Sequence, residues 1–122
     1  MRVIVGGAVA WADADAIRRE LSRLPAGAVI IHGDCRGADD LAGRVGRELG
    51  FTVERWVKNK DDERKHGRPR AWMGLNERML ASGARLVLVF HAELYTPDAA
   101  RGSKHLMALA TTAGAEVRGF TA

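Results

Sequence analysis

The 122-residue sequence contains a single cysteine, Cys35, and no long apolar run. One cysteine cannot form a disulfide within the chain, so a disulfide framework is excluded and a reducing compartment is expected. No apolar stretch approaches the roughly 20 residues that cross a bilayer. The first residues, MRVIVGG, lack the long apolar stretch of a signal peptide. We therefore expect a cytoplasmic protein without a membrane partner.

Several signatures of metal and nucleotide sites are also missing. The four histidines show no metal-ligand spacing and none stands beside a cysteine or carboxylate cluster, so no metal site is expected. No Gly-Lys-Ser/Thr follows a glycine-rich turn, which excludes a Walker loop. The stretch GGAVAW lacks the third glycine of the dinucleotide fingerprint. Nothing in the sequence implies a bound cofactor.

The net positive charge of the chain arises from one segment. The apolar fraction of 47% and the charged fraction of 28% are those of an ordinary globular protein. Residues 55–70 hold seven Lys/Arg and three Asp/Glu, which accounts for the whole net charge of +4. A local basic surface indicates an anionic partner, either a phosphate-bearing ligand or nucleic acid. The alternative is a solvated loop without a ligand.

Short aliphatic runs alternate with helical periodicity along the chain. Strands are expected at RVIVGG, AVIIHG, FTVERWV, RLVLVF and EVRGF, and helices over 13–24, 38–49, 69–82 and 103–113. The basic segment before the third helix is expected to be a long loop. This alternation predicts an α/β fold, a single three-layer Rossmann-like domain over residues 1–122, with a mostly parallel sheet of about five strands and helices on both faces.

In such a sheet, ligands bind beyond the carboxyl ends of the strands. Within IIHGDCRGAD, Gly33 and Gly37 permit a tight turn, and the following amides begin a helix with its positive end outward. The Arg36 guanidinium suits phosphate. Asp39 either caps the helix or accepts a hydrogen bond from a ribose hydroxyl. The residues at the strand ends are Gly6, Gly7, His32, Gly33, Asp34, Arg36, Gly37, Asp39 and His91, and they predict a cradle for phosphate and sugar.

Two side chains in this turn are candidates for chemistry. Cys35 lies beside a helix N-terminus and Arg36, both of which lower a thiol pKa. No base is fixed next to it in the sequence, so we expect a pocket-lining residue. His32 contacts a ligand, serves as acid or base, or bonds only to the backbone. His32 is thus a candidate for catalysis, together with the Asp39 carboxylate described above.

Several segments occur in a characteristic order: RVIVGG, HGDCRGADDLA, HGRPRAWMGLNERML, LVLVF and ARGSKHLMALATTAG. In this order and spacing the chain resembles the YspA (cpYpsA-related) branch of the SLOG superfamily over nearly its whole length. The resemblance implies a Rossmann-like fold shared with the lonely-guy phosphoribohydrolases and with DprA. It also implies a nucleotide or nucleotide-derived ligand, a bacterial or phage source, and a homodimer or larger oligomer.

Carried over position by position, the resemblance implies a pocket built from four segments. The stretch ARGS stands where the family has a Gly-Gly-x-Gly-Thr phosphate loop, and Ser103 can cap the helix and contact phosphate as threonine would. From their positions in the sequence, Trp56 is the better candidate to stack on a base, with packing as the alternative, whereas Trp72 is assigned to the core. His66 and Arg68 are expected to close over an anionic ligand. The implied pocket residues are Gly6, Gly7, His32, Gly33, Arg36, Gly37, Asp39, Asn76, Arg78, Gly102 and Ser103.

Two departures from the family pattern bear on enzymatic activity. Ala8 stands where many relatives have arginine, which removes one ligand contact. Leu106 stands where the phosphoribohydrolases carry their catalytic glutamate, and leucine cannot act as a general acid or base. Glu93 and Asp98 in the preceding loop are alternatives, although a solvated loop is the simpler interpretation. Phosphoribohydrolase chemistry is therefore not expected.

Three functions remain open. The first is binding of a nucleotide or an ADP-ribose-like ligand, as a sensor or sequestering protein. The second is hydrolysis of a glycosidic or phosphate bond in a nucleotide. The third is DprA-like DNA binding through the basic residues 55–70.

Overall fold

The computed structural model describes all 122 residues and contains one sheet of five strands. The strands are β1 (Arg2–Gly7), β2 (Val29–His32), β3 (Thr52–Arg55), β4 (Leu86–Phe90) and β5 (Glu116–Phe120). They lie in the order β3-β2-β1-β4-β5, and every neighbouring pair is parallel. The helices are α1 (Ala14–Leu21), α2 (Ala38–Glu48), α3 (Lys60–His66), α4 (Ala71–Ala81) and α5 (Arg101–Thr112), with a short 3-10 helix, η1 (Arg68–Arg70).

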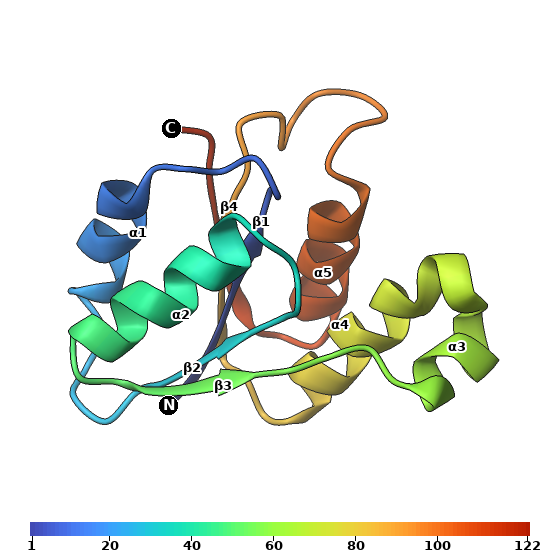
Figure 1. Cartoon of the computed structure of the whole chain (residues 1–122), viewed down its shortest axis with the longest axis horizontal. Helices are drawn as coiled ribbons and strands as arrows, with labels where there is room; N and C mark the ends of the chain where they lie inside the picture. Colours follow the sequence, from blue (N-terminus) through green and yellow to red (C-terminus); the bar gives the residue numbers. More distant parts are fainter.

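Helices cover both faces of the sheet (Figure 1). Successive strand residues point to opposite faces, so β1 supplies Val3 and Val5 to a core under α1 and α2, and Ile4 to a core under α4 and α5. All five residues of β4 are buried, as expected for a central strand with helices on both sides. The structure confirms the predicted Rossmann-like three-layer fold, with a sheet that is parallel throughout. None of the helices is long and apolar enough to span a bilayer.

The prediction of a long loop over the basic segment is wrong, because residues 60–66 form α3. Asn59 accepts a hydrogen bond from the Asp62 amide at 2.9 Å, and Asp62 accepts one from the Asn59 amide at 2.9 Å, which completes a capping box. Acidic residues occupy the first turn and basic residues the last, which complements the helix dipole. Apolar periodicity is absent from this helix, so its hydrophobic pattern did not reveal it.

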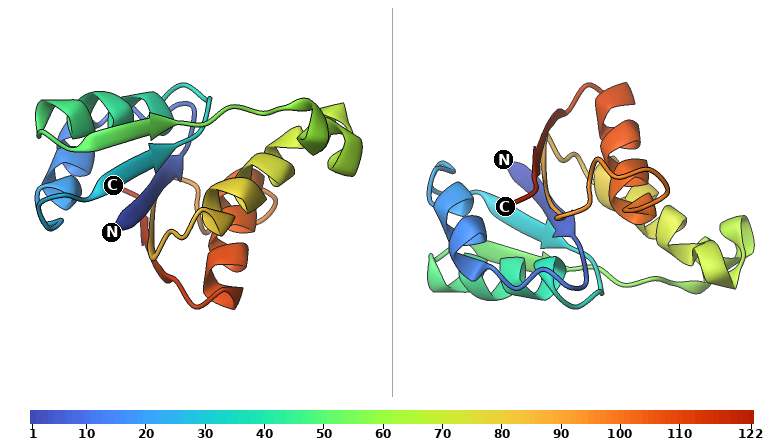
Figure 2. Two further views of the ribbon diagram at one scale, coloured as in Figure 1. Left: turned by 90° about the horizontal axis from the view of Figure 1, so that it is seen from below. Right: turned by 90° about the horizontal axis from the view of Figure 1, so that it is seen from above.

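Residues 59–70 form a lobe, here called the α3–η1 lobe, that projects beyond the sheet (Figure 2). The Asp62 side chain is 3% exposed and receives two hydrogen bonds from Arg78 of α4, at 2.9 and 2.6 Å. His66 and Lys65 both bond to the Glu77 carboxylate on α4, at 2.7 and 3.1 Å. The lobe is therefore attached to α4 by ion pairs on two sides.

Candidate functional site

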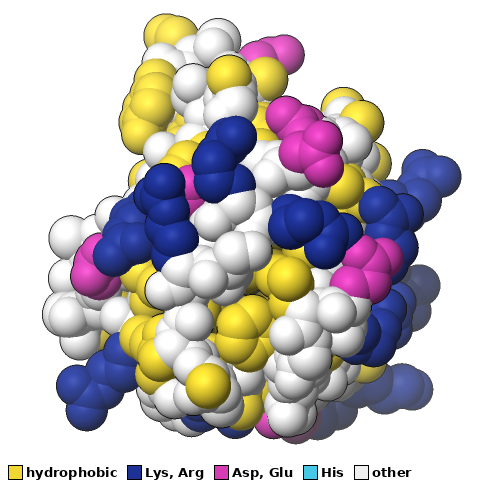
Figure 3. All heavy atoms as spheres, turned by 90° about the vertical axis from the view of Figure 1, so that its left-hand side faces the viewer, with side chains coloured by type: hydrophobic (Ala, Val, Ile, Leu, Met, Phe, Trp, Pro, Cys, Tyr) yellow, Lys and Arg dark blue, Asp and Glu magenta, His cyan; other side chains and the backbone are white.

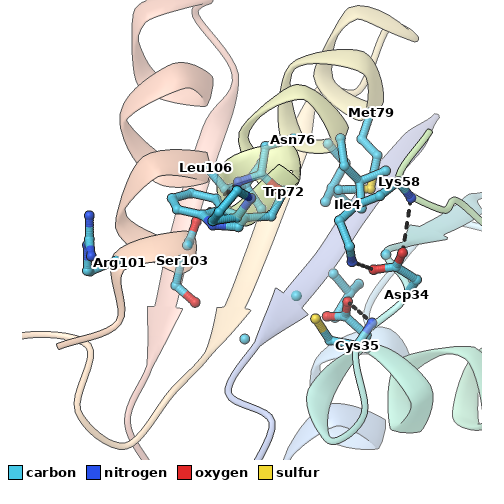
Figure 4. A pocket seen from close by; sticks show the side chains of 18 of the residues that line it. Ile4, Asp34, Cys35, Lys58, Trp72, Asn76, Met79, Arg101, Ser103 and Leu106 are labelled. Carbon is cyan, nitrogen blue, oxygen red and sulfur yellow. Dashed lines mark hydrogen bonds and ion pairs between the residues drawn. The ribbon is translucent and has the colours of Figure 1, made fainter. Parts of the chain in front are cut away.

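A cavity of about 410 Å³ opens beyond the carboxyl ends of β1 and β2 (Figure 4). The turn after β2, the segment η1, helix α4 and the first turn of α5 complete its walls. Nine of the residues predicted from the sequence line it: Gly6, Gly7, Gly33, Asp34, Asp39, Arg68, Asn76, Gly102 and Ser103. Topology thus brings together residues that lie almost 100 positions apart in the chain.

The other predicted site residues lie outside this cavity: His32, Arg36, Gly37, Trp56, His66, Arg78 and His91. The His32 ring is buried towards α2, and its Nδ1 bonds to the Gly33 carbonyl at 2.8 Å. Burial lowers the pKa of His32, more than its hydrogen bond to Gly33 raises it. The Arg36 side chain is exposed and forms no ion pair. His91 lines a second hollow, of about 300 Å³, together with Trp11.

The glycines of the predicted cradle have roles within the protein itself. A Cβ at Gly7 would lie 1.9 Å from the carbonyl oxygen of Phe90, because β1 and β4 run close together there. A Cβ at Gly37 would collide with the backbone that follows β1. A Cβ at Gly33 would lie 2.8 Å from Asp39 Oδ2. Gly33 therefore makes room for a carboxylate of the protein.

One end of the cavity carries carboxylates. Asp34 Oδ1 accepts from Lys58 Nζ at 2.6 Å and Asp34 Oδ2 accepts from the Lys58 amide at 3.0 Å (Figure 4). Burial raises the pKa of Asp34, but the hydrogen bonds from Lys58 outweigh it and the pKa lies below its usual value. Asp39 contacts no cation. Burial raises the pKa of Asp39 to about 7, against the lowering effect of a hydrogen bond from the Cys35 amide.

The opposite end of the cavity is the first turn of α5. The first hydrogen bond of this helix joins the Lys104 amide to the Ala100 carbonyl at 2.8 Å, so the preceding amides have no partner in the helix. No acidic residue lies in this turn, and Arg101 forms no ion pair. Ala100 has left-handed backbone angles, φ 57° and ψ 40°, where the family phosphate loop has glycine. The turn thus presents free amides and the Ser103 side chain to the cavity, and the exposed Arg101 lies at the edge of the cavity (Figure 4).

The wall between these ends is largely apolar. Leu75, Met79 and Leu106 contribute side chains that are at least 95% buried. Leu106 stands where the resemblance places the phosphoribohydrolase glutamate, so the wall carries no carboxylate there. Asn76 Nδ2 donates to the Gly102 carbonyl at 3.2 Å and lies 3.2 Å from His105 Nδ1, which ties α4 to the first turn of α5. Asn76 therefore positions the turn that faces the cavity.

Sequence reasoning assigned the two tryptophans differently from their places in the structure. Trp72 lines the cavity, with its ring edge-on to His105 at a centroid distance of 5.4 Å. Trp56 lies outside it, with Nε1 bonded to Glu54 at 3.0 Å and the Arg78 guanidinium 5.7 Å from its ring. Trp72 stands one helical turn before Asn76, which was the available signal that it faces the same cavity. Lys58 and Arg101 also line the cavity without having been predicted, and Cys35, expected to line a pocket, is among its lining residues.

The positions of Arg78 and Asp62 lead to a stability prediction. We expect Arg78→Met to lower the free energy of unfolding by about 2 kcal/mol, because it leaves the buried Asp62 carboxylate without its partner. The effect is smaller than for a fully buried pair, since the Arg78 side chain is 32% exposed. Urea denaturation near neutral pH measures it. Asp62→Asn in the Arg78→Met background should recover part of the loss, and failure to do so would contradict this explanation.

Most cations of the basic segment are already paired. Of its seven Lys/Arg residues, four form ion pairs: Lys58 with Asp34, Arg64 with Asp61, Lys65 with Glu77 and Arg68 with Glu63. On the face formed by α1 and α2, Lys and Arg side chains lie in separate groups with Asp and Glu among them (Figure 3). Positive charge on the α1 and α2 face is therefore divided, and in the basic segment more than half of the cations are paired.

The parallel sheet with helices on both faces and the cavity beyond its carboxyl edge define a Rossmann-like α/β protein. Residues 1–61 match the family described as YAcAr: YspA, cpYpsA-related SLOG family. The chain is 36% identical over 126 residues to the Gene 61 protein of Mycobacterium phage D29, covering 98% of this chain and 95% of that protein. No solved structure matches the chain. The chain belongs to the YspA, cpYpsA-related SLOG family.

Proposed function

We propose that this protein binds a nucleotide or nucleotide-derived ligand, such as a nucleoside phosphate or an ADP-ribose-like molecule, and acts as a sensor or sequestering protein. The observation that carries the proposal is the first turn of α5. Free amides and Ser103 lie there at one end of the cavity, with the unpaired Arg101 at its edge. Helix N-termini of this kind bind phosphate through their amides and their dipole.

The phosphate is placed at α5 because the other helix N-terminus at the cavity is unsuited to an anion. The first turn of α2 carries Asp39 and Asp40, and Asp34 lies close by. The Ala38 amide is bonded to the Ala8 carbonyl at 3.0 Å, and the Cys35 amide to Asp39 at 3.3 Å. Negative charge in this turn opposes an anion at α2, and its Ala38 amide is already occupied. The apolar wall between the two ends then accommodates the nucleoside.

The cavity favours binding over the chemistry of the phosphoribohydrolases. Leu106 stands where the phosphoribohydrolases have their catalytic glutamate, and leucine can neither donate nor accept a proton. Burial and the nearby Asp39 raise the pKa of the Cys35 thiol, so this thiol is not activated as a nucleophile. Hydrolysis is the second candidate function, because the pKa of Asp39 of about 7 is in the range that suits a general acid or base. DNA binding is not proposed, since most cations of the basic segment are paired.

The proposal predicts that Arg101→Glu weakens the binding of AMP or ADP-ribose by about tenfold or more, because a charge-assisted hydrogen bond to phosphate is lost and a like charge is introduced. Isothermal titration calorimetry measures the affinity. Arg85→Glu is the matched control, since Arg85 is also exposed and unpaired but precedes β4, at the opposite edge of the sheet. Arg36→Glu should have little effect, because Arg36 does not line the cavity.

The same samples separate the remaining alternatives. If neither AMP nor ADP-ribose binds, or if Arg101→Glu and Arg85→Glu behave alike, the phosphate site at α5 is wrong. Release of free base or phosphate, lost in Asp39→Asn, would establish the hydrolase instead. Analytical ultracentrifugation tests the homodimer that the family resemblance implies.

A further inference from the structure

The carboxylate of Asp39 is the least compensated polar group in the cavity. The residue is 8% exposed, and its only hydrogen bond within the protein is from the Cys35 amide to Oδ2, at a long 3.3 Å. Oδ1 accepts no hydrogen bond from the protein. A buried charge of this kind normally has a partner. Its partner is therefore to be sought in what the cavity binds.

The backbone around Asp39 is shaped to hold this carboxylate at the cavity floor. Gly33, just after β2, lies so close that a Cβ there would be 2.8 Å from Oδ2. Gly6 near the end of β1 would place a Cβ 3.6 Å from Oδ1. The carboxylate thus lies over the ends of two adjacent strands, and at Gly33 a Cβ would crowd it. Both glycines line the same cavity.

Helix capping does not account for the buried position of the Asp39 side chain. The N-cap of α2 is Gly37, and no side chain caps this helix. A first-turn carboxylate that only complements the helix dipole can remain in water, as the exposed Asp40 does. Asp39 instead is buried in a cavity that is partly apolar, and burial of a carboxylate without a partner is costly.

The charges around Asp39 determine which ligand group suits it. The groups that face it are Asp34, Asp40, Lys58 and the Cys35 thiol. Lys58 is held by Asp34 at 2.6 Å and is not available to Asp39. A ligand anion would meet three carboxylates here. The complementary group is a neutral hydrogen-bond donor, and two adjacent hydroxyls match the two oxygens of a carboxylate.

We propose that Asp39 accepts hydrogen bonds from the vicinal hydroxyls of a ribose, so that the cavity selects ribonucleotides over 2′-deoxyribonucleotides. This inference rests on the proposed function, with the phosphate at the first turn of α5 and the sugar towards β2. It goes beyond that function by assigning the sugar end of the ligand and the residue that determines its class.

The test compares AMP with 2′-deoxy-AMP, with ADP-ribose as a third probe, by isothermal titration calorimetry at about pH 8. We expect AMP to bind about tenfold tighter than 2′-deoxy-AMP, the effect of one hydrogen bond to a charged acceptor. Asp39→Asn should reduce this ratio to within about threefold, because the amide accepts at one atom only and carries no charge. Asp40→Asn, which changes an exposed neighbour in the same turn, should leave the ratio unchanged.

A second measurement uses only the wild-type protein, so it does not require that a variant folds. In the wild-type protein the ratio should shrink at about pH 5.5, where Asp39 is protonated, whereas a purely structural role would leave it constant. Equal binding of AMP and 2′-deoxy-AMP at about pH 8 would overturn the inference and leave the proposed function standing. A ratio that neither pH nor Asp39→Asn changes would overturn the assignment to Asp39. Failure of all three probes to bind would reject the proposed function and this inference together.

Discussion

Replacing Gly37 with alanine should lower the free energy of unfolding by about 3 kcal/mol or more, enough to unfold a marginal domain. Gly37 has φ 74° and ψ −123°, a conformation that L-residues avoid. The added Cβ would also lie 2.2 Å from the Val9 carbonyl oxygen and 2.4 Å from that of Ala8. Both atoms belong to the backbone after β1, so relieving the collision requires the two loops of the site to separate. Urea denaturation followed by circular dichroism measures the loss.

Gly50→Ala is the matched control for this prediction. Gly50 has φ 88°, close to that of Gly37, but no atom lies within 4 Å of the position its Cβ would take. This substitution carries backbone strain alone and should cost about 1 kcal/mol. Equal losses for the two variants would show that the close approach of the loops contributes nothing.

Asp39→Asn should stabilise the protein at about pH 8, by as much as about 4 kcal/mol. The pKa of Asp39 is about 7 in the folded state, against an ordinary value of 3.8. Between these values the folded state binds more protons than the unfolded state, so wild-type stability falls as the pH rises and levels off above pH 7. Asparagine does not titrate. The difference in free energy of unfolding between variant and wild type should therefore grow from about pH 4 to 7 and then stay constant.

Urea denaturation at several pH values checks this dependence, with Asp40→Asn as the exposed control. A gap that is the same at every pH would mean that Asp39 is not the buried, protonated group described above. A gain in stability with loss of ribose selectivity would show that the site is maintained at the expense of stability, as functional sites often are.

The fold was largely predictable because its signals are local. The aliphatic run LVLVF predicts a strand buried on both faces, and β4 is buried at every position. The alternation of such runs with amphipathic helices leaves a parallel sheet as the natural arrangement. Helix α3 was missed because its signal is a pair of side chains, Asn59 and Asp62, within a segment that has no apolar face.

The candidate site was predictable in its location and less so in its details. Strand ends show where a cavity forms, and Gly6, Gly33 and Asp39, predicted on that basis, line it. Ser103 also lines the cavity, but only the family resemblance implied it. The direction of each side chain depends on packing between elements that are distant in the sequence. Arg36 is exposed to solvent and Trp72 packs towards α5, and no local sequence pattern predicts either direction. The pairing of Lys58 with Asp34 across 24 residues is equally invisible in sequence.

The attachment of the α3–η1 lobe to α4 has a kinetic consequence. Arg68 and Pro69 of this lobe form part of the cavity wall, and the ion pair of Asp62 with Arg78 holds the lobe in place before any ligand arrives. A site whose walls are assembled in advance needs no slow rearrangement before association. The rate of ligand capture should then be set by diffusion and rise in proportion to ligand concentration without a plateau, so that differences in affinity among ligands reside in how quickly each one leaves.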